Sequence, residues 1–479
     1  MEKLKLWIGG KWVLPKSGKT FPTFNPATGE VIAQIPLAGK PEIDMAAAAA
    51  RKAFESWSRL RQAERSNFVM KISAAIKENV KELARLETLE HGTCSCDVFG
   101  ALGAASGDME YAAMSARSLM GDHIPAVPGT LTYLRREPIG VCALITPWNH
   151  ALGMMAVKLG QALSTGNTAI IKPPSVNSLI GLKFAEILDG VGLPAGVVNI
   201  VTGPGSTTGD MLVRHPEVDV IGFTGSSATG KQLMEAGSQT LKKLIMELGG
   251  NNPVIVLEDA DVDKAIEYHA PRQYHNAGQH CSGAGRYYVH AKIYDKFVEK
   301  FVSVSKKVVV GDPADPKTFL GPVAMVEHRD RLEAYIKSGV EEGAKLVLGG
   351  KRPTKAPLNK GFYVLPTVFT HVKEEMKIGK EETFGPIAVI MEPFTDEEDV
   401  IQKANATRYG LCATVWTEDV NKGLRFVDRL HAGTVNINTQ VLTAELPWGG
   451  FKESGFGKEG SMEGLLGYTQ IKMVCLKYQ

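Results

Sequence analysis

The sequence predicts an α/β protein of two units, each built on a parallel, doubly wound sheet. From about residue 139 onward, short β-branched runs alternate with amphipathic segments. This alternation is typical of βαβ units, in which a helix returns the chain to begin the next parallel strand. The pattern restarts after about residue 250, so we expect two α/β domains joined near Glu247. The length of 479 residues predicts about three domains, because domains commonly hold about 100–200 residues.

The elements of the first unit follow from this pattern. Residues 42–91 combine helical spacing with abundant Ala, Lys and Glu, and are expected to form helices. Five runs are expected to be strands: 139–146, 168–171, 197–201, 218–223 and 244–248. The amphipathic segments between them are expected to be helices: 178–188, 205–213 and 228–236.

The second unit shows the same alternation. Helices are expected near 261–274, 293–307 and 328–343, and strands at 286–290, 363–370, 386–391, 411–416 and 433–437. The sequence contains no internal repeat and no low-complexity tract.

Composition excludes several functional classes. Hydrophobic residues make up 44% and charged residues 22% of the chain, as in ordinary soluble globular proteins. Lys+Arg 54 against Asp+Glu 52 leaves a net charge of +2 without a basic block, so no nucleic-acid surface is expected. The N-terminus does not resemble a signal peptide, and no uncharged apolar stretch approaches the ~18 residues that span a bilayer. Six scattered cysteines form no disulfide framework, which favours the reducing cytoplasm.

The segment around Cys281 carries the strongest chemical signal. It lies among glycines, small residues and hydroxyl groups in the run 276–286, where a thiol can be reached from solvent. Glu247 stands upstream at the end of an apolar run, followed by Gly249 and Gly250. A thiol nucleophile and a carboxylate base suit acylation followed by hydrolysis, although either residue alone is more often structural.

Further candidates lie where strands are expected to end, because ligands of such sheets bind at the carboxyl ends of strands. Asn149 follows the first strand and is either an oxyanion donor or a helix N-cap. Lys172 ends the second strand, where it either holds a ribose or phosphate or is simply solvated. Gly203, Gly205 and Gly209 lack the G-x-G-x-x-G spacing of a dinucleotide loop.

Two other interpretations start from local motifs. The run from Gly225 to Lys231 nearly matches the phosphate loop of NTPases, but Gln232 stands where a magnesium-binding hydroxyl is required. A P-loop NTPase is therefore the alternative function. No metal site is expected from four residues that crowd one stretch at spacings matching no zinc signature: His269, His275, His280 and Cys281.

Eight short motifs, taken in order, resemble those of the NAD(P)-dependent aldehyde dehydrogenase superfamily over essentially the whole chain. Each motif alone is weak, but their common order and spacing make a chance match negligible. They are Asn25-Pro26-Ala27-Thr28-Gly29-Glu30, Pro147-Trp148-Asn149, Lys172-Pro173, Phe223-Thr224-Gly225-Ser226, Glu247-Leu248-Gly249-Gly250, Gly278-Gln279-His280-Cys281, Glu382-Thr383-Phe384-Gly385-Pro386 and Pro447-Trp448-Gly449-Gly450.

The resemblance implies oxidation of a small aldehyde through a covalent intermediate. Cys281 would attack the carbonyl, and the Asn149 amide with the Cys281 backbone N–H would hold the oxyanion. Hydride would pass to NAD or NADP, and Glu247 would activate the water that hydrolyses the thioester. This base argues against a relative that forms acyl-CoA, and no catalytic metal is implied.

The resemblance also implies the coenzyme site. Lys172 would hold the adenosine ribose, and Ser226 would donate to the pyrophosphate at the N-terminus of the helix that follows. Glu382 and Phe384 would place the nicotinamide ribose and ring. The expected coenzyme residues are Thr146, Trp148, Lys172, Ser175, Gly225, Ser226, Gly230, Leu248, Glu382 and Phe384.

Ser175 is a departure from the family pattern. Many NAD-preferring relatives carry a glutamate there that grips the ribose 2′-hydroxyl and repels a 2′-phosphate. A neutral hydroxyl beside Lys172 would instead attract that phosphate. We therefore expect NADP to be accepted, alone or with NAD.

The expected substrate pocket is more polar than in many relatives that oxidise aliphatic aldehydes. Its motif around Trp448 also occurs in betaine- and amino-aldehyde enzymes, but the rest of an aromatic box for a quaternary ammonium is not evident, nor is an arginine cluster for a carboxylate. The sequence therefore does not identify the aldehyde. The expected pocket residues are His150, Met154, Val157, His280, Ser282 and Trp448.

The family architecture implies three parts. Residues 1–119 and 139–248 would form a Rossmann-like coenzyme-binding domain, and residues 249–463 an α/β catalytic domain. Residues 120–138 and 464–479 would form a small β oligomerisation element, giving a homodimer or homotetramer. Neither a nucleic acid nor a membrane is expected as a partner.

Overall fold

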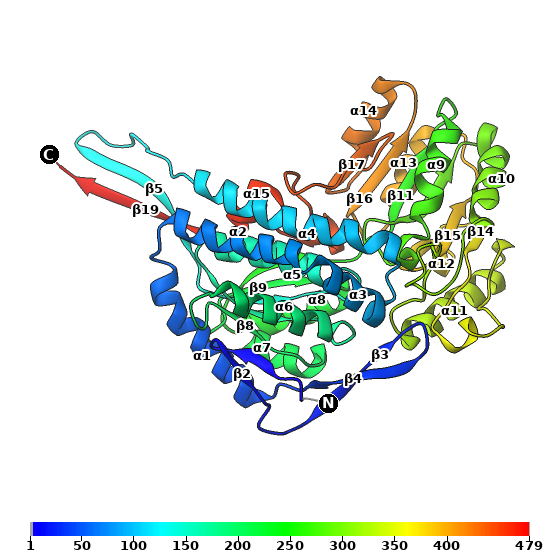
Figure 1. Cartoon of the computed structure of the whole chain (residues 1–479). Coiled ribbons are helices and arrows are strands. Elements are labelled where there is room, and N and C mark those ends of the chain that lie inside the picture. Colours follow the sequence, from blue (N-terminus) through cyan, green and yellow to red (C-terminus); the bar gives the residue numbers. More distant parts are fainter. Residues whose placement is uncertain (1–2, 479) are drawn as a thin grey trace.

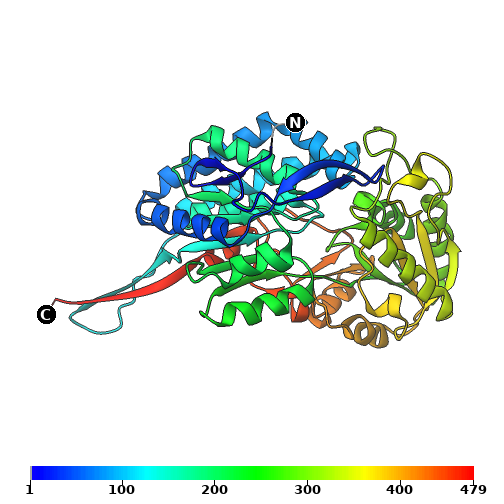
Figure 2. The ribbon, with the colours of Figure 1, turned by 90° about the horizontal axis from the view of Figure 1, so that it is seen from below.

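The structure, a computed structural model that describes residues 3–478, confirms the predicted α/β class. Two helix-covered sheets form two bodies, and a two-stranded arm projects from one of them (Figures 1 and 2). Among the described residues no helix is long and apolar enough to cross a membrane.

The first sheet has eight strands in the order β18-β10-β9-β6-β7-β8-β1-β2. The five from β10 to β8 are parallel and largely buried, which explains their continuous apolar sequences. Numbered along the chain they run 3-2-1-4-5 from β8 to β10, so the strand order reverses between β6 and β9. The strands are β1 (Leu6–Ile8), β2 (Lys11–Val13), β6 (Val141–Ile145), β7 (Thr168–Lys172), β8 (Val198–Ile200), β9 (Val220–Thr224), β10 (Lys243–Glu247) and β18 (Gly455–Phe456).

Helices cover this sheet. Two of them, α4 (Ser95–Ser115) and α5 (Ala151–Ser164), were not predicted. α5 packs against α4 and is largely buried. The helix predicted over 205–213 is instead a π-helical turn (Gly205–Gly209) followed by a short helix. The helices are α1 (Lys40–Trp57), α2 (Gln62–Glu78), α3 (Val80–His91), α4 (Ser95–Ser115), α5 (Ala151–Ser164), α6 (Ser178–Val191), α7 (Asp210–Arg214) and α8 (Ser227–Ser238).

The second sheet has seven strands in the order β13-β14-β15-β12-β11-β16-β17. β11 and β13 were not predicted. The strands are β11 (Asn252–Val256), β12 (Ala284–Val289), β13 (Lys345–Leu348), β14 (Thr367–Val372), β15 (Ile387–Met391), β16 (Cys412–Trp416) and β17 (Thr434–Ile437). The helices of this unit are α9 (Val262–Arg272), α10 (Tyr294–Ser305), α11 (Val326–Glu341), α12 (Lys377–Lys380), α13 (Glu397–Asn405) and α14 (Val420–Arg429).

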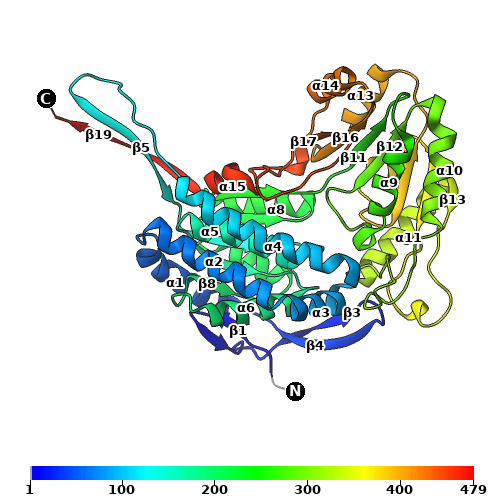
Figure 3. The same ribbon diagram turned by 45° about the horizontal axis from the view of Figure 1, so that its top comes forward.

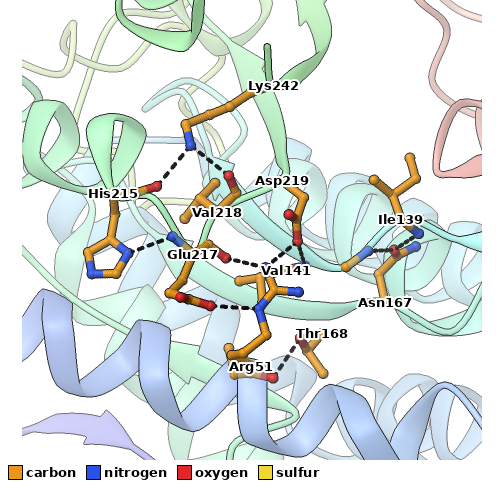
Figure 4. Close-up of polar contacts among 12 residues, drawn as sticks. Arg51, Ile139, Val141, Asn167, Thr168, His215, Glu217, Val218, Asp219 and Lys242 are labelled. Atoms are coloured by element: carbon orange, nitrogen blue, oxygen red, sulfur yellow. Dashed lines mark hydrogen bonds and ion pairs between the residues drawn. The ribbon is translucent and has the colours of Figure 1, made fainter. Parts of the chain in front are cut away.

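A polar network fixes the amino ends of the central strands (Figure 4). Arg51 of α1 donates to the Glu217 carboxylate at 2.8 Å and to Asp219 at 2.6 Å. The Asp219 carboxylate also accepts the Val141 N–H at 2.8 Å, which ties the start of β6 to the segment before β9. Lys242 donates to two main-chain carbonyls in the same region. These contacts hold neighbouring strands in register.

The arm consists of β5 (Thr130–Pro138) and β19 (Thr469–Lys477), which pair antiparallel along their whole length. α15 (Ser461–Gly467) lies at the base of the arm beside α4 (Figure 3). Apolar side chains on the arm are exposed, among them Leu131, Ile471 and Met473. A second hairpin, β3 (Thr20–Asn25) with β4 (Glu30–Pro36), reaches the other unit, where Pro26 O accepts Phe362 N–H at 2.8 Å.

Candidate active site

Three neighbouring strands of the first sheet end in buried polar atoms that have no hydrogen-bond partner within residues 3–478. These atoms are Thr146 Oγ1 after β6, Thr224 Oγ1 at the end of β9, and both carboxylate oxygens of Glu247 at the end of β10. Buried polar groups without partners are rare in folded proteins and indicate a site for a ligand, ion or water. They lie at the strand-order reversal, where such sheets bind ligands.

Glu247 is 2% exposed and lies against Gly449, where an added Cβ would come within 2.6 Å of Glu247 Oε1. Burial, reinforced by the nearby Glu459 carboxyl, raises the pKa of Glu247 well above its ordinary value. Glu459 forms a fully buried ion pair with Lys158 of α5. A protonatable carboxyl therefore stands beside a second, paired carboxylate.

The segment before Cys281 has a constrained backbone. Asn276, Ala277 and Gly278 adopt φ values of 47°, 55° and 72°, and the first two have the side chains that make this conformation unfavourable. At Gly278 a Cβ would lie 2.2 Å from Gly385 O, so the two backbones touch and only glycine fits. The turn that precedes Cys281 is therefore held against Gly385 within the second unit.

Side-chain amides hold the backbone around Cys281. Asn252 Nδ2 donates to Cys281 O at 2.7 Å and to Gly283 O at 2.8 Å. From the first unit, Asn149 Nδ2 donates to Gln279 O at 2.9 Å, which uses one of its two N–H groups. The second N–H of Asn149 remains available for another acceptor.

The Cys281 thiol is partly exposed. Burial of the surrounding site raises the pKa of Cys281 to about 12, and the Glu382 and Glu247 carboxyls act in the same direction. The side chain is thus a neutral thiol at neutral pH, and its reactivity depends on a base or on a positive charge brought near it.

Lys172 is buried at the end of β7. Its Nζ donates to Pro173 O at 2.8 Å and to Gly203 O at 3.1 Å, which leaves one N–H free. Burial lowers the pKa of Lys172 to about 8. Ser175 follows in the partly exposed loop before α6.

The predicted coenzyme loop opens α8. Ser226 is the helix N-cap and accepts the Thr229 N–H at 3.2 Å. Added Cβ atoms would collide with Phe223 at Gly225 (2.5 Å) and with Leu248 at Gly230 (2.8 Å), so both glycines are needed for packing.

Lys231 does not face a phosphate-binding loop. Its side chain is 60% exposed and forms an ion pair with Glu453 at 2.9 Å. The P-loop NTPase alternative therefore has no support.

An aromatic group from both units forms around Trp148. The Phe384 ring meets it edge-on at a centroid distance of 5.4 Å, and His328 lies at the same distance. Phe384 has a φ of 57°, and its carbonyl is bonded to His328 Nε2 at 2.7 Å. Glu382, two residues earlier, accepts Gly250 N–H at 3.0 Å, and burial raises its pKa to about 7.

Two of the expected pocket residues contact each other across the units. His150, which follows Asn149, has its Nε2 3.0 Å from Nδ1 of His280, which precedes Cys281. Met154 and Val157 lie on α5 and are partly exposed. Trp448 pairs through its backbone with Glu459, and the described residues show no ring contact between Trp448 and the histidine pair.

A family model described as the aldehyde dehydrogenase family matches residues 12–474. The chain belongs to the aldehyde dehydrogenase family. The predicted class of activity, NAD(P)-linked oxidation of an aldehyde, is therefore confirmed at the level of the family.

Curated relatives agree with this assignment. Betaine aldehyde dehydrogenase of Bacillus subtilis is 40% identical over 473 residues, covering 98% of this chain and 96% of the relative. Mouse aldehyde dehydrogenase 1A1 is 41% identical over 483 residues, which cover 100% of this chain and 95% of the relative. Cytosolic 10-formyltetrahydrofolate dehydrogenase of Xenopus tropicalis is 40% identical, but this chain spans only 53% of its length.

Solved structures share the fold. Betaine aldehyde dehydrogenase of Staphylococcus aureus, in complex with NAD+, superposes with a TM-score of 0.96 at 36% identity over 99% of this chain and 94% of the other. A putative aldehyde dehydrogenase of Burkholderia cenocepacia gives 0.97 at 36% identity, covering 100% and 98%.

Several residues of this aldehyde dehydrogenase site were missed by sequence reasoning. Lys158 is a single charged residue in a mostly apolar segment, and this pattern could have indicated the buried Lys158–Glu459 ion pair. Asn252, Glu459 and His328 gave none, since each acts through contacts distant in sequence. The described residues hold no group of three or more His, Cys, Asp or Glu arranged for a metal ion.

Proposed function

We propose that this aldehyde dehydrogenase acts through Cys281, Asn149 and Glu247, in the roles of nucleophile, oxyanion donor and base. Two observations carry the proposal: Asn149 is bonded to the backbone of the Cys281 loop at Gln279, and the unpartnered Glu247 carboxyl lies near enough to Cys281 to raise its pKa. As a thiolate, Cys281 forms a bond to the aldehyde carbon, and the free Asn149 N–H with the Cys281 backbone N–H stabilises the resulting oxyanion.

A bound nicotinamide coenzyme supplies the hydride acceptor, and the protein offers groups that fit it. The unpartnered hydroxyls of Thr146 and Thr224 line the strand-order reversal, and Lys172 keeps a free N–H beside them. The S. aureus relative binds NAD+. We assign the coenzyme site to Thr146, Trp148, Lys172, Ser175, Gly225, Ser226, Gly230, Leu248, Glu382 and Phe384.

Ser175 supports acceptance of NADP as well as NAD, because no carboxylate at this position opposes a 2′-phosphate. Steady-state kcat/KM for the two coenzymes measures this directly. A strong preference for NAD would contradict the assignment of Ser175.

Loss of a hydride from the adduct to the bound coenzyme would leave a thioester on Cys281, and Glu247 would then remove a proton from the water that cleaves this thioester. Its raised pKa means that the base form is lost as the pH falls through that raised value, so hydrolysis slows toward acid pH. The buried Lys158–Glu459 pair beside Glu247 offers the next acceptor for this proton.

The substitution Cys281→Ala tests the proposal. It should abolish aldehyde oxidation and leave coenzyme binding, measured by fluorescence titration, within about twofold, since the coenzyme contacts lie on other segments. Cys475→Ala on the exposed arm is the matched control and should keep full activity. Turnover by the Cys281 variant would overturn the assignment.

We further propose the predicted division into coenzyme-binding, catalytic and oligomerisation parts. The exposed apolar side chains of the β5–β19 arm support assembly into a homodimer or homotetramer. Light scattering of wild type and of a Met473→Glu variant would test this role. The six free cysteines support a reducing, cytoplasmic location, which cell fractionation would test.

A further inference from the structure

A hydrogen-bonded pair of histidines flanks the place where the aldehyde would react. His150 directly follows Asn149, and His280 directly precedes Cys281. Their rings lie with centroids 5.1 Å apart, and Nε2 of His150 is 3.0 Å from Nδ1 of His280. The pair therefore joins the oxyanion segment to the nucleophile segment on the substrate side.

Both rings are neutral at neutral pH. Burial lowers the pKa of His150 to about 4, and the pKa of His280 well below its ordinary value, with neighbouring histidines acting in the same direction. A neutral pair shares one proton in its hydrogen bond, so the other nitrogen of His150, Nδ1, is a donor in one tautomer and an acceptor in the other.

His150 Nδ1 has no hydrogen-bond partner among the described residues. This atom is also not fully buried, which leaves it available for a further hydrogen bond. His150 adjoins Asn149 in the chain, and its ring is bonded to His280, which adjoins Cys281, so the two residues proposed to act on the carbonyl flank the pair.

We infer that this site selects short hydroxyaldehydes, in which a hydroxyl close to the carbonyl carbon forms a hydrogen bond with His150 Nδ1. The inference rests on the proposed roles of Asn149 and Cys281. A hydroxyl both donates and accepts, so it matches either tautomer of the pair. An unsubstituted alkyl aldehyde would leave the ring nitrogen without a partner once water is displaced, which costs binding energy.

Other substituents fit less well. A carboxylate would meet neutral imidazoles and Asp97, whose side chain pairs with His275 at 2.6 Å. Arg272, the cation that acts on His280, is exposed and stacked over the Tyr268 ring at 4.3 Å. A quaternary ammonium would require several aromatic faces, whereas the rings here present polar edges to each other.

The test compares aldehydes that differ by one hydroxyl: glycolaldehyde with acetaldehyde, and lactaldehyde or 3-hydroxypropanal with propanal. We expect wild type to show a kcat/KM about 10–100-fold higher for the hydroxylated member of at least one pair, as for a polar group selected by a matched site. Equal values within every pair would overturn the inference while leaving the proposed function intact. Failure to oxidise any aldehyde would overturn the proposed function itself.

Variants locate the preference at His150. His150→Phe should remove it by lowering the ratio of kcat/KM for the hydroxyaldehyde to kcat/KM for the unsubstituted aldehyde about 10-fold or more. His150→Gln, whose amide can donate and accept, should retain part of the preference, and exposed His431→Phe should retain all of it. Unchanged coenzyme binding and Tm in His150→Phe would confirm folding, and an equal loss on both members of a pair would assign His150 a structural role.

Discussion

Two groups of polar side chains at opposite ends of the first sheet differ in whether they have hydrogen-bond partners. At the amino end, Arg51, Asp219 and Lys242 all have partners, and none of the side chains drawn in Figure 4 belongs to the buried polar groups without one. At the carboxyl end, the hydroxyls of Thr146 and Thr224 and the carboxylate of Glu247 have no hydrogen-bond partner among the described residues.

This difference separates stability from function. Satisfied polar groups contribute to the free energy of unfolding, whereas buried groups without partners lower it unless a ligand or water completes them. Substitutions at the amino end should therefore cost stability, and those around the carboxyl end should cost activity. The predictions below test this separation.

Asn149→Ala should give the largest loss of rate in this set. Removal of one oxyanion donor typically lowers kcat by about 10²–10³-fold. Denaturant unfolding of the same variant should show a change of at most about 1 kcal/mol, the size of one neutral hydrogen bond. A kcat within about threefold of wild type would contradict the role of Asn149 as an oxyanion donor.

Lys172→Met should raise the coenzyme Kd by about 10–100-fold, as expected for loss of a charged hydrogen bond, and change kcat little once coenzyme is saturating. Lys231→Met is the matched control, because Lys231 is exposed and paired with Glu453. Equal effects of the two substitutions on Kd would contradict the placement of the coenzyme beside β7.

Alkylation of Cys281 by iodoacetamide in the coenzyme-free protein should become about tenfold faster per pH unit from pH 7 to 9.5. The thiolate is the reactive form, and a pKa raised to about 12 places this whole range below the midpoint. Peptide-resolved mass spectrometry would follow Cys281 and the exposed Cys475 together. A plateau for Cys281 near pH 8 would contradict the raised pKa.

Arg51→Met should change kcat/KM by less than about twofold, the smallest effect on activity. It should nevertheless lower the free energy of unfolding by about 1–3 kcal/mol, because Glu217 and Asp219 lose their charged partner. Urea unfolding followed by circular dichroism measures the change. A large loss of kcat/KM in the folded variant would contradict the conclusion that this network at the amino end serves stability and not activity.

The sequence predicted the central strands well because strands buried on both faces have continuous β-branched runs. It missed α4 and α5, and it missed β11 because that strand follows Gly249 and Gly250 almost directly. Local motifs placed Cys281, Glu247 and Asn149 at ends of elements. The buried Lys158–Glu459 pair and the His150–His280 contact join residues far apart in the chain, which no local pattern encodes.

The central claim is that the unpartnered carboxyl of Glu247 serves catalysis at a late step. The direct measurement is rapid mixing of Glu247→Gln with coenzyme and aldehyde, followed by mass spectrometry of the protein. The amide keeps the shape of the side chain but cannot take a proton from water. We predict a burst of about one reduced coenzyme per site, a much slower steady state, and an acyl group on Cys281. Turnover at the wild-type rate, or loss of the burst together with the steady state, would contradict the claim.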